Sequence, residues 1–307
     1  MNISVAIPET SLSDESQKSA KTRKASVIAR ACAIFGVEAI YVYGEGGSRD
    51  AKSARSVGGK SDADLLITSL RYLETPQFLR RHLFAHTGDL KFAGVMLPLR
   101  IPSHTTSRKL EAGQVREGVI IPAGGKKGRR EVGGSGGGKF IDVGANRPLR
   151  YTGRAPPGRR VTVRIKNAGP DATYAEIDRK QAGLYWGYSV RGRASLKSLL
   201  AEWEGQVIVT SRKGRPVRGA PAGGGKRDGS TDVPSSRILR DRSDLLVVFG
   251  SPERGVHEIL GGGAGAMSSA RILDFFPGQQ TATVRLEEAI LGALAIINAE
   301  AAWLSSR

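Results

Sequence analysis

Short, almost wholly apolar segments near both ends of the chain set the strongest constraint on its fold. Residues 38–43 (EAIYVY), 206–210 (QVIVT) and 245–249 (LLVVF) are rich in β-branched and aromatic residues and are shorter than a typical helix. Segments with helical periodicity lie between them, most clearly residues 21–36, where small apolar residues recur every three or four positions. Apolar strands bracketed by helices predict an α/β fold whose parallel sheet is covered on both faces.

The same periodicities predict further helices and strands along the chain. Gly36 is expected to close the first helix, and Pro76 is expected to bend a later one because proline removes a backbone hydrogen bond. The remaining predicted elements are strands at 3–7 and 272–276 and helices at 61–84, 196–203, 254–260 and 284–304.

The middle of the chain has a different sequence pattern. Between residues 91 and 178, short strand-like runs such as RRVTVRIKN and ATYAEID are separated by Gly/Pro-rich links, which favours an antiparallel barrel or sandwich. We therefore expect an α/β domain built from residues 1–90 and 179–307, interrupted by an all-β insertion at 91–178. Two further stretches, 123–139 and 217–234, are glycine-rich and basic, and they are predicted to be loops.

The charge balance points to a polyanionic partner. The 307 residues include 47 Lys+Arg against 29 Asp+Glu, a net charge of +18, which favours nucleic acid over an anionic membrane surface in a folded chain. The single cysteine, Cys32, lies on the apolar stripe of the first helix and is expected to be a buried thiol. With no evident signal peptide or membrane span, a cytoplasmic location is expected.

The sequence contains partial matches to several known motifs, but none of these motifs is complete. Residues 133–140 (GGSGGGKF) have a P-loop frame, but Phe140 replaces the Ser/Thr and a strand follows. In residues 44–49 (GEGGSR), Arg49 takes the place of the third glycine of a dinucleotide fingerprint. The four histidines form no zinc-binding frame, so no metal is expected. Residues 250–254 (GSPER) are not a hydrolase nucleophile elbow.

Three loops that follow predicted strands are the more informative feature. They span residues 211–214 (SRKG), 250–255 (GSPERG) and 277–283 (PGQQTAT). In open α/β sheets, ligands bind outside the carboxyl ends of the strands. Loops rich in Gly, Pro and Thr at one such edge offer backbone groups to a purine and hydroxyls to a ribose, so a nucleotide-like ligand is expected there.

The C-terminal run FGSPERGVHEIL…ILDFFPGQQTATVRLEEAILGALAIIN resembles the cofactor half of SPOUT methyltransferases. Together with SVAIPETSL, TRKASVIARACAIFGVEAIYVY, RYLETPQFLR and LYWGYSVR, it resembles the archaeal and eukaryotic branch of RNA methyltransferases that carries an inserted OB-like barrel. This resemblance covers nearly the whole chain. It implies a SPOUT-type α/β knot with a deep C-terminal trefoil knot, bound S-adenosylmethionine, and a homodimer.

The resemblance also implies site residues. Arg30, within IARACAIFG, is similar in setting to the N-terminal arginine motif of several SPOUT branches and is the catalytic candidate, although an RNA-contacting role is equally open; Arg23 and Arg285 are lesser candidates. Thr281 and Thr283 either hold the methionine end of the cofactor or cap the last helix. The implied cofactor-binding residues are Thr210, Ser211, Arg212, Gly250, Glu253, Gly255, Phe276, Pro277, Gln279, Thr281 and Thr283.

The activity implied is N3-methylation of uridine in large-subunit rRNA. Residues alone do not separate this from another RNA target, and a non-catalytic RNA-binding or ribosome-assembly factor that retains the fold is the alternative. Methyl transfer needs orientation more than acid–base groups, which agrees with the scarcity of histidine. The inserted barrel is expected to grip RNA through Arg147, Arg150, Arg154, Arg159, Arg160 and Arg164.

Overall fold

The computed structural model describes residues 1–45, 61–84, 87–122, 138–193, 195–217, 243–261 and 270–305, which fall into two compact units. The first comprises Met1–Arg71, Asp89–Pro98 and Tyr188–Arg307, and the second comprises Tyr72–Gly88 and Leu99–Gly187. The second unit thus extends beyond the expected insertion at 91–178 on its C-terminal side and takes in a helical segment before it. Arg49, His86 and most of the two predicted basic loops lie outside the described residues.

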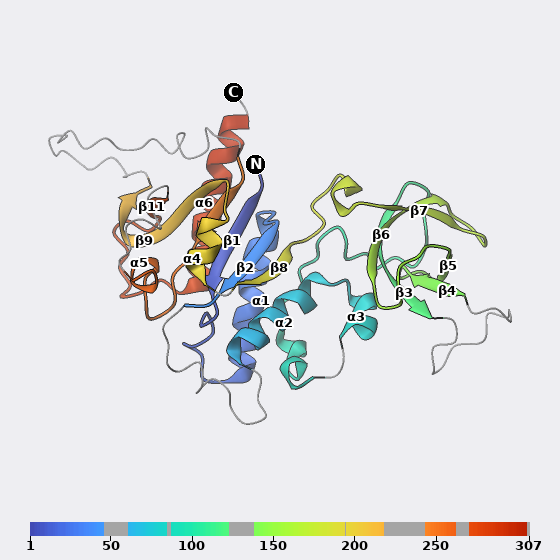
Figure 1. The fold of residues 1–307 in the computed structure, drawn as a ribbon, viewed down its shortest axis with the longest axis horizontal. Coiled ribbons are helices and arrows are strands. Elements are labelled where there is room, and N and C mark those ends of the chain that lie inside the picture. The colour runs from blue at the N-terminus through green and yellow to red at the C-terminus, as the bar shows by residue number, and fades with distance from the viewer. Residues whose placement is uncertain are drawn as a thin grey trace. The chain divides into compact units, whose positions relative to one another are not determined.

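The first unit contains the predicted parallel sheet (Figure 1). Its strand order is β11-β9-β10-β1-β2-β8, and every pairing is parallel. The edge strand β8 was not predicted, because its sequence SVRGR has neither an apolar run nor alternation. The strands are β1 (Ile3–Pro8), β2 (Ala39–Tyr43), β8 (Ser189–Arg193), β9 (Gln206–Pro216), β10 (Leu245–Val248) and β11 (Arg271–Asp274).

Six α-helices occur among the described residues, close to their predicted positions. Gly36 follows the first helix with a φ of 65°, as expected for a glycine that ends a helix. Pro76 separates α2 from α3, so the predicted bend is a complete break. The helices are α1 (Lys18–Ile34), α2 (Asp62–Glu74), α3 (Gln77–Leu83), α4 (Leu196–Ala201), α5 (Val256–Ile259) and α6 (Leu286–Ser305), with 3-10 turns η2 (Gly88–Leu90), η3 (Ala93–Val95) and η4 (Arg179–Ala182).

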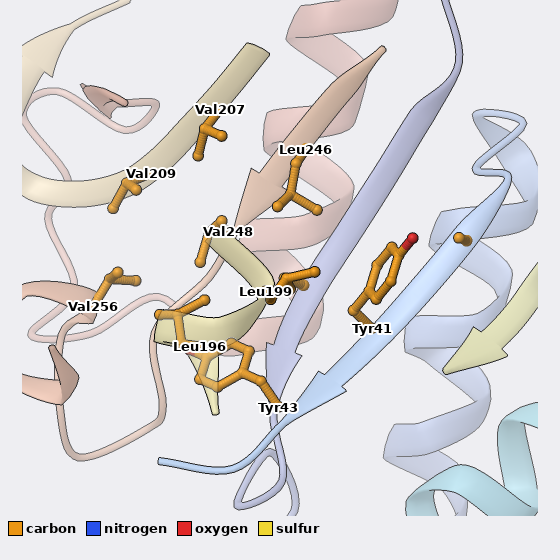
Figure 2. Close-up of a cluster of buried hydrophobic side chains, with 11 residues drawn as sticks. Tyr41, Tyr43, Leu196, Leu199, Val207, Val209, Leu246, Val248 and Val256 are labelled. Atoms are coloured by element: carbon orange, nitrogen blue, oxygen red, sulfur yellow. The ribbon is translucent and has the colours of Figure 1, made fainter. Parts of the chain in front are cut away.

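Helices cover both faces of the parallel sheet. On one face, Leu196 and Leu199 of α4 pack with Tyr43 and Val248 of the strands (Figure 2). On the other face, α1 and α6 lie side by side behind the strands (Figure 1). Cys32 is fully buried in α1 as predicted, and this burial raises the pKa of its thiol to about 12. None of the helices in the described ranges is both long and apolar enough to cross a bilayer.

The second unit is built around a curled antiparallel sheet of order β5-β4-β3-β6-β7. Its two edge strands meet through side chains, since the Tyr151 hydroxyl donates to Glu176 Oε2 over 3.3 Å and the Tyr174 hydroxyl donates to the Arg150 carbonyl over 3.0 Å. The strands are β3 (Val115–Pro122), β4 (Lys139–Asp142), β5 (Leu149–Tyr151), β6 (Arg160–Asn167) and β7 (Thr173–Ile177).

One predicted loop needs correction. Residues 211–214 are not a loop after a strand, because β9 continues through them to Pro216. The pairing with β11 nevertheless jumps, from Val209↔Ile272 to Arg215↔Leu273, so residues 210–214 are skipped by the ladder. A strand with this irregularity looks in the sequence like a strand followed by a polar loop, since the skipped residues need no apolar partner.

Candidate active site

The neighbouring central strands β1 and β10 continue in opposite directions. From β1 the chain passes through α1 to β2 on one side, whereas from β10 it passes through α5 to β11 on the other side. Crevices at such topological switch points, outside the carboxyl ends of the strands, are the ligand sites of open α/β sheets. The predicted site lies at this edge of the sheet.

The loop after β10 is a tight turn that requires glycine. The Ser251 N–H donates to the Arg254 carbonyl over 2.9 Å, and the Arg254 N–H donates to Ser251 Oγ over 2.9 Å. A Cβ on Gly250 would lie 2.8 Å from the Arg254 carbonyl oxygen. Gly255 begins α5 as its N-cap, and Glu253 and Gly255 are both exposed. The turn is therefore exposed at the sheet edge, although the N–H groups of Ser251, Arg254 and Gly255 are bonded within it or to Glu258.

The loop after β11 is held by hydrogen bonds between its own residues. The Phe276 N–H donates to Asp274 Oδ1 over 2.9 Å, and Gln279 Nε2 donates to the Thr281 carbonyl over 2.9 Å. The ring of Phe276 lies against Gly292 of α6, where a Cβ would be only 2.5 Å from Phe276 Cζ. Pro277 is exposed.

The capping role considered for the two threonines of this loop is filled by another residue. The Arg285 N–H, just before α6, donates to Glu288 Oε2 over 2.9 Å. Thr281 and Thr283 are exposed, and their hydroxyls make no hydrogen bond within the described part of the chain. They are therefore available to a ligand.

The first predicted cofactor segment is bonded to β10 and to the loop after β11. Thr210 Oγ1 donates to the carbonyl of Val248, at the end of β10, over 3.2 Å. Arg212 Nη1 donates to the carbonyl of Ala282, in the loop after β11, over 2.8 Å. Ser211 accepts the Lys213 N–H over 3.2 Å. Residues 210–212 thus contact the end of β10 and the loop after β11.

Sequence reasoning missed a buried carboxylate at the same edge. Glu45 follows β2 and is only 4% exposed, and its two oxygens accept bonds from Thr10 Oγ1 and Arg254 Nη2. It therefore ties the ends of β1, β2 and β10 together. Its position directly after an apolar strand is the one signal for it in the sequence, within GEGGSR.

Arg30, the catalytic candidate, lies on α1 and is partly exposed. Its Nη1 donates to the Pro98 carbonyl over 2.6 Å, and none of its hydrogen bonds within the described residues reaches the three cofactor segments. Of the lesser candidates, Arg23 is exposed and Arg285 pairs with Glu15 over 3.0 Å.

A buried lysine on α1 was also missed. Lys24 is 4% exposed and lies 2.6 Å from Asp14 and 3.2 Å from Glu287. Asp14 belongs to the loop after β1, and Glu287 to the first turn of α6. Lys24 therefore links the loop at the switch point to the helix that follows the last cofactor segment.

The predicted RNA-contacting arginines differ in their surroundings. Arg160 is held by carboxylates, with Nη1 2.6 Å from Glu74 Oε2 and Nε 2.6 Å from Glu117 Oε2. Burial alone would lower the pKa of Arg160, but these two carboxylates raise it. Its position is therefore that of a structural ion pair. The exposed members are Arg147, Arg150, Arg154, Arg159 and Arg164.

A hollow among the described residues lies elsewhere. It measures about 270 Å³ and is lined by Tyr41, Arg191, Trp203 and Asp244, among others. Asp244 directly precedes β10, so this hollow opens toward the amino ends of the strands, opposite the switch-point edge. No three His, Cys, Asp or Glu side chains gather into a metal-binding group within the described ranges.

Comparison with known proteins identifies the family. A family model described as "Putative RNA methyltransferase" matches residues 2–297. The human 28S rRNA (uridine-N(3))-methyltransferase is 34% identical over 318 residues, which cover 96% of this chain and 77% of the human protein. The mouse protein of the same name is 33% identical, covering 99% and 78%. An uncharacterized protein of Halobacterium salinarum is 31% identical, covering 96% and 98%. The chain belongs to this RNA methyltransferase family, and it is an enzyme that transfers methyl groups to RNA.

Proposed function

We propose that this enzyme uses S-adenosylmethionine to methylate N3 of a uridine in large-subunit rRNA. The observation that carries the proposal is the arrangement of three Gly-, Pro- and Thr-rich segments at the carboxyl edge of the sheet, where Thr210 bonds to the last residue of β10 and Arg212 bonds to the loop after β11. The target follows the names of the human and mouse relatives, which are similar over nearly the whole chain.

The residues at this edge fit an adenosyl group. Gly250 permits the tight turn after β10, Phe276 and Pro277 supply an apolar surface, and Thr281 and Thr283 supply exposed hydroxyls. The donor would bring an activated methyl group, and the protein's task is to hold the acceptor in line with it. We assign donor binding to Thr210, Ser211, Arg212, Gly250, Glu253, Gly255, Phe276, Pro277, Gln279, Thr281 and Thr283.

Arg30 is proposed to act on the RNA side of the site. Its bond to the Pro98 carbonyl fixes the side chain but uses one of five N–H donors. The remaining donors suit a phosphate or a uracil oxygen, because a guanidinium presents them in a rigid plane.

We further propose that the curled sheet is an OB-like barrel that holds RNA. In chain order its strands pair first with second, second with third, first with fourth, and fourth with fifth. The third and fifth meet through Tyr151–Glu176 and Tyr174–Arg150. This is the connectivity of a five-stranded, partly open Greek-key barrel. The exposed arginines then contribute phosphate contacts, whereas Arg160 is assigned to the structure of the barrel.

The remaining proposals rest on the resemblance. We propose a trefoil knot in the C-terminal part of the first unit and a homodimer in the cytoplasm. Two partly or largely exposed apolar residues support the dimer: Ile34 at the end of α1 is 57% exposed and Leu291 of α6 is 43% exposed, on helices that pack together. Sedimentation of the purified protein tests the dimer.

Transfer of radiolabelled methyl groups from S-adenosylmethionine to large-subunit rRNA tests the function, followed by mass spectrometry of the modified nucleoside. We expect N3-methyluridine. A protein that binds rRNA tightly but neither binds the donor in calorimetry nor labels the RNA would instead be a non-catalytic ribosome-assembly factor.

A further inference from the structure

We propose that Arg254 is a catalytic residue that stabilises the deprotonated uracil of the acceptor, and that Glu45 is the residue that positions it. This inference rests on the proposed function, which it deepens by naming the group that makes the uridine N3 nucleophilic. Arg254 lies in the predicted ligand loop 250–255 and Glu45 in residues 44–49, but neither side chain belongs to the donor site assigned above.

The pair lies beside the proposed donor site. Arg254 belongs to the loop after β10, directly beside Gly250 and Gly255 of the donor site, and its Nη2 is paired with Glu45 Oε2. Glu45 comes from the end of β2, on the other side of β1 in the sheet. The pair therefore crosses the carboxyl end of β1, next to the switch point between β1 and β10.

The two partners differ in exposure. The side chain of Glu45 is 4% exposed, whereas that of Arg254 is 41% exposed. Both carboxylate oxygens are engaged, one by Thr10 Oγ1 and the other by Arg254. The buried carboxylate thus anchors one edge of the guanidinium, and the N–H donors of the remaining edges are left for a ligand, since no other side-chain hydrogen bond of Arg254 occurs within the described residues.

The chemistry needs such a donor. The N3–H bond of uracil must break, its proton passing to water, while the electron pair stays on the ring and is shared with O4 and O2. The N3 pair then forms the new N–C bond as the C–S bond of the sulfonium donor breaks and its electrons go to sulfur. A fixed guanidinium beside O4 or O2 stabilises the anion without reorganising, as donors of an oxyanion hole do. The negative charge of Glu45 does not abolish this stabilisation of the uracil anion, because the carboxylate faces Thr10 and only one edge of the Arg254 guanidinium.

The test compares two transcripts of one large-subunit rRNA fragment, made with uridine or with 5-fluorouridine, whose N3 is more acidic. Methyl transfer from S-adenosylmethionine is measured for the wild type, Arg254→Gln, Glu45→Gln and the exposed α4 control Lys197→Gln. We expect Arg254→Gln to lower kcat by about 100-fold on uridine and by less than about tenfold on 5-fluorouridine. Glu45→Gln should show the same pattern more weakly, because its amide still accepts from Thr10 but no longer pairs a charge.

A second readout does not depend on turnover. Fluorine NMR is recorded on the 5-fluorouridine transcript bound to the protein without the methyl donor. The wild type should lower the N3 pKa of one 5-fluorouridine in the RNA, and Arg254→Gln should not. The inference is overturned if Arg254→Gln lowers kcat equally on both transcripts, even if uridine is methylated. It is also overturned if the N3 pKa of the bound RNA is the same for the wild type and Arg254→Gln. If the wild type methylates neither transcript, the proposed function fails, and the NMR shift alone decides the role of Arg254.

Discussion

The guanidinium of Arg212 donates a hydrogen bond of 2.8 Å to the carbonyl oxygen of Ala282. Arg212 lies in the stretch of β9 that the ladder with β11 skips, and Ala282 lies in the loop that β11 leads into. The bond therefore joins two segments that the strands themselves do not hold in register, and it fixes one wall of the proposed donor site.

Arg212→Met should weaken donor binding while leaving the fold intact. One exposed hydrogen bond contributes about 1 kcal/mol, so we expect the Kd for S-adenosylmethionine to rise roughly three- to tenfold in isothermal titration. Lys213→Met, at the exposed neighbouring position, is the matched control and should leave the Kd unchanged. Equal affinities in both variants would show that the bridge to Ala282 does not shape the donor site.

Much of the first unit could be predicted because its signals are local. The apolar strands and the helical stripe around Ile28 and Cys32 require only periodicity, and Gly36 and Pro76 act on the backbone where they stand. The two loops after β10 and β11 follow from the positions of their strands. The edge strand β8 was missed because its partner lies on one side only, so its sequence SVRGR needs no apolar run.

The side-chain contacts of the site could not be predicted in the same way. Glu45 and Arg254 are separated by 209 positions in the chain, and the parallel order of β10, β1 and β2 brings them together. Likewise, Arg160 looked like the other basic residues of its strand. Only the carboxylates of Glu74 and Glu117, 86 and 43 positions away, distinguish it from an RNA-contacting arginine.

The two glycines of the turn after β10 should respond differently to a methyl group. A Cβ at Gly250 would lie 2.8 Å from the Arg254 carbonyl oxygen, whereas a Cβ at Gly255 meets nothing within 4 Å. We expect Gly250→Ala to lower the free energy of unfolding by about 1–3 kcal/mol because backbone must shift. Gly255→Ala should lower it by no more than about 1 kcal/mol. Urea unfolding measures both, and a larger loss for Gly255→Ala would contradict the described turn.

Substitutions of Arg160 and Arg150 should have different effects, the first on stability and the second on RNA binding. Arg160→Met leaves the buried Glu117 without its cation, whereas Glu74 keeps Arg179, so we expect a loss of about 3 kcal/mol in stability. Adding Glu117→Gln should recover part of it. Exposed Arg150→Met should leave the urea midpoint nearly unchanged and reduce the slope of log K for rRNA binding against log salt by about 1. If Arg160→Met instead weakened RNA binding at unchanged stability, its assignment to the barrel structure would be wrong.

His104 gives the second unit a pH-dependent stability. Burial lowers the pKa of His104, and the nearby Arg80 adds to this, although the hydrogen bond to the Glu74 backbone opposes it. The ring is therefore neutral in the folded protein, and its Nε2–H donates to the Glu74 carbonyl over 2.8 Å. The unfolded chain has an ordinary histidine pKa of about 6.5.

The direction of the effect follows from proton uptake. Above about pH 6.5 both states carry a neutral ring, so His104 adds no pH dependence. Below that value the unfolded chain takes up a proton that the folded protein does not, and stability falls until the pH reaches the lowered folded pKa. His104→Gln removes this titration while keeping an N–H donor. The stability advantage of the wild type over His104→Gln, measured by urea unfolding, should therefore be larger at pH 8 than at pH 5.5. An advantage that grows on acidification would mean that His104 is charged in the fold and that its bond to Glu74 involves an imidazolium.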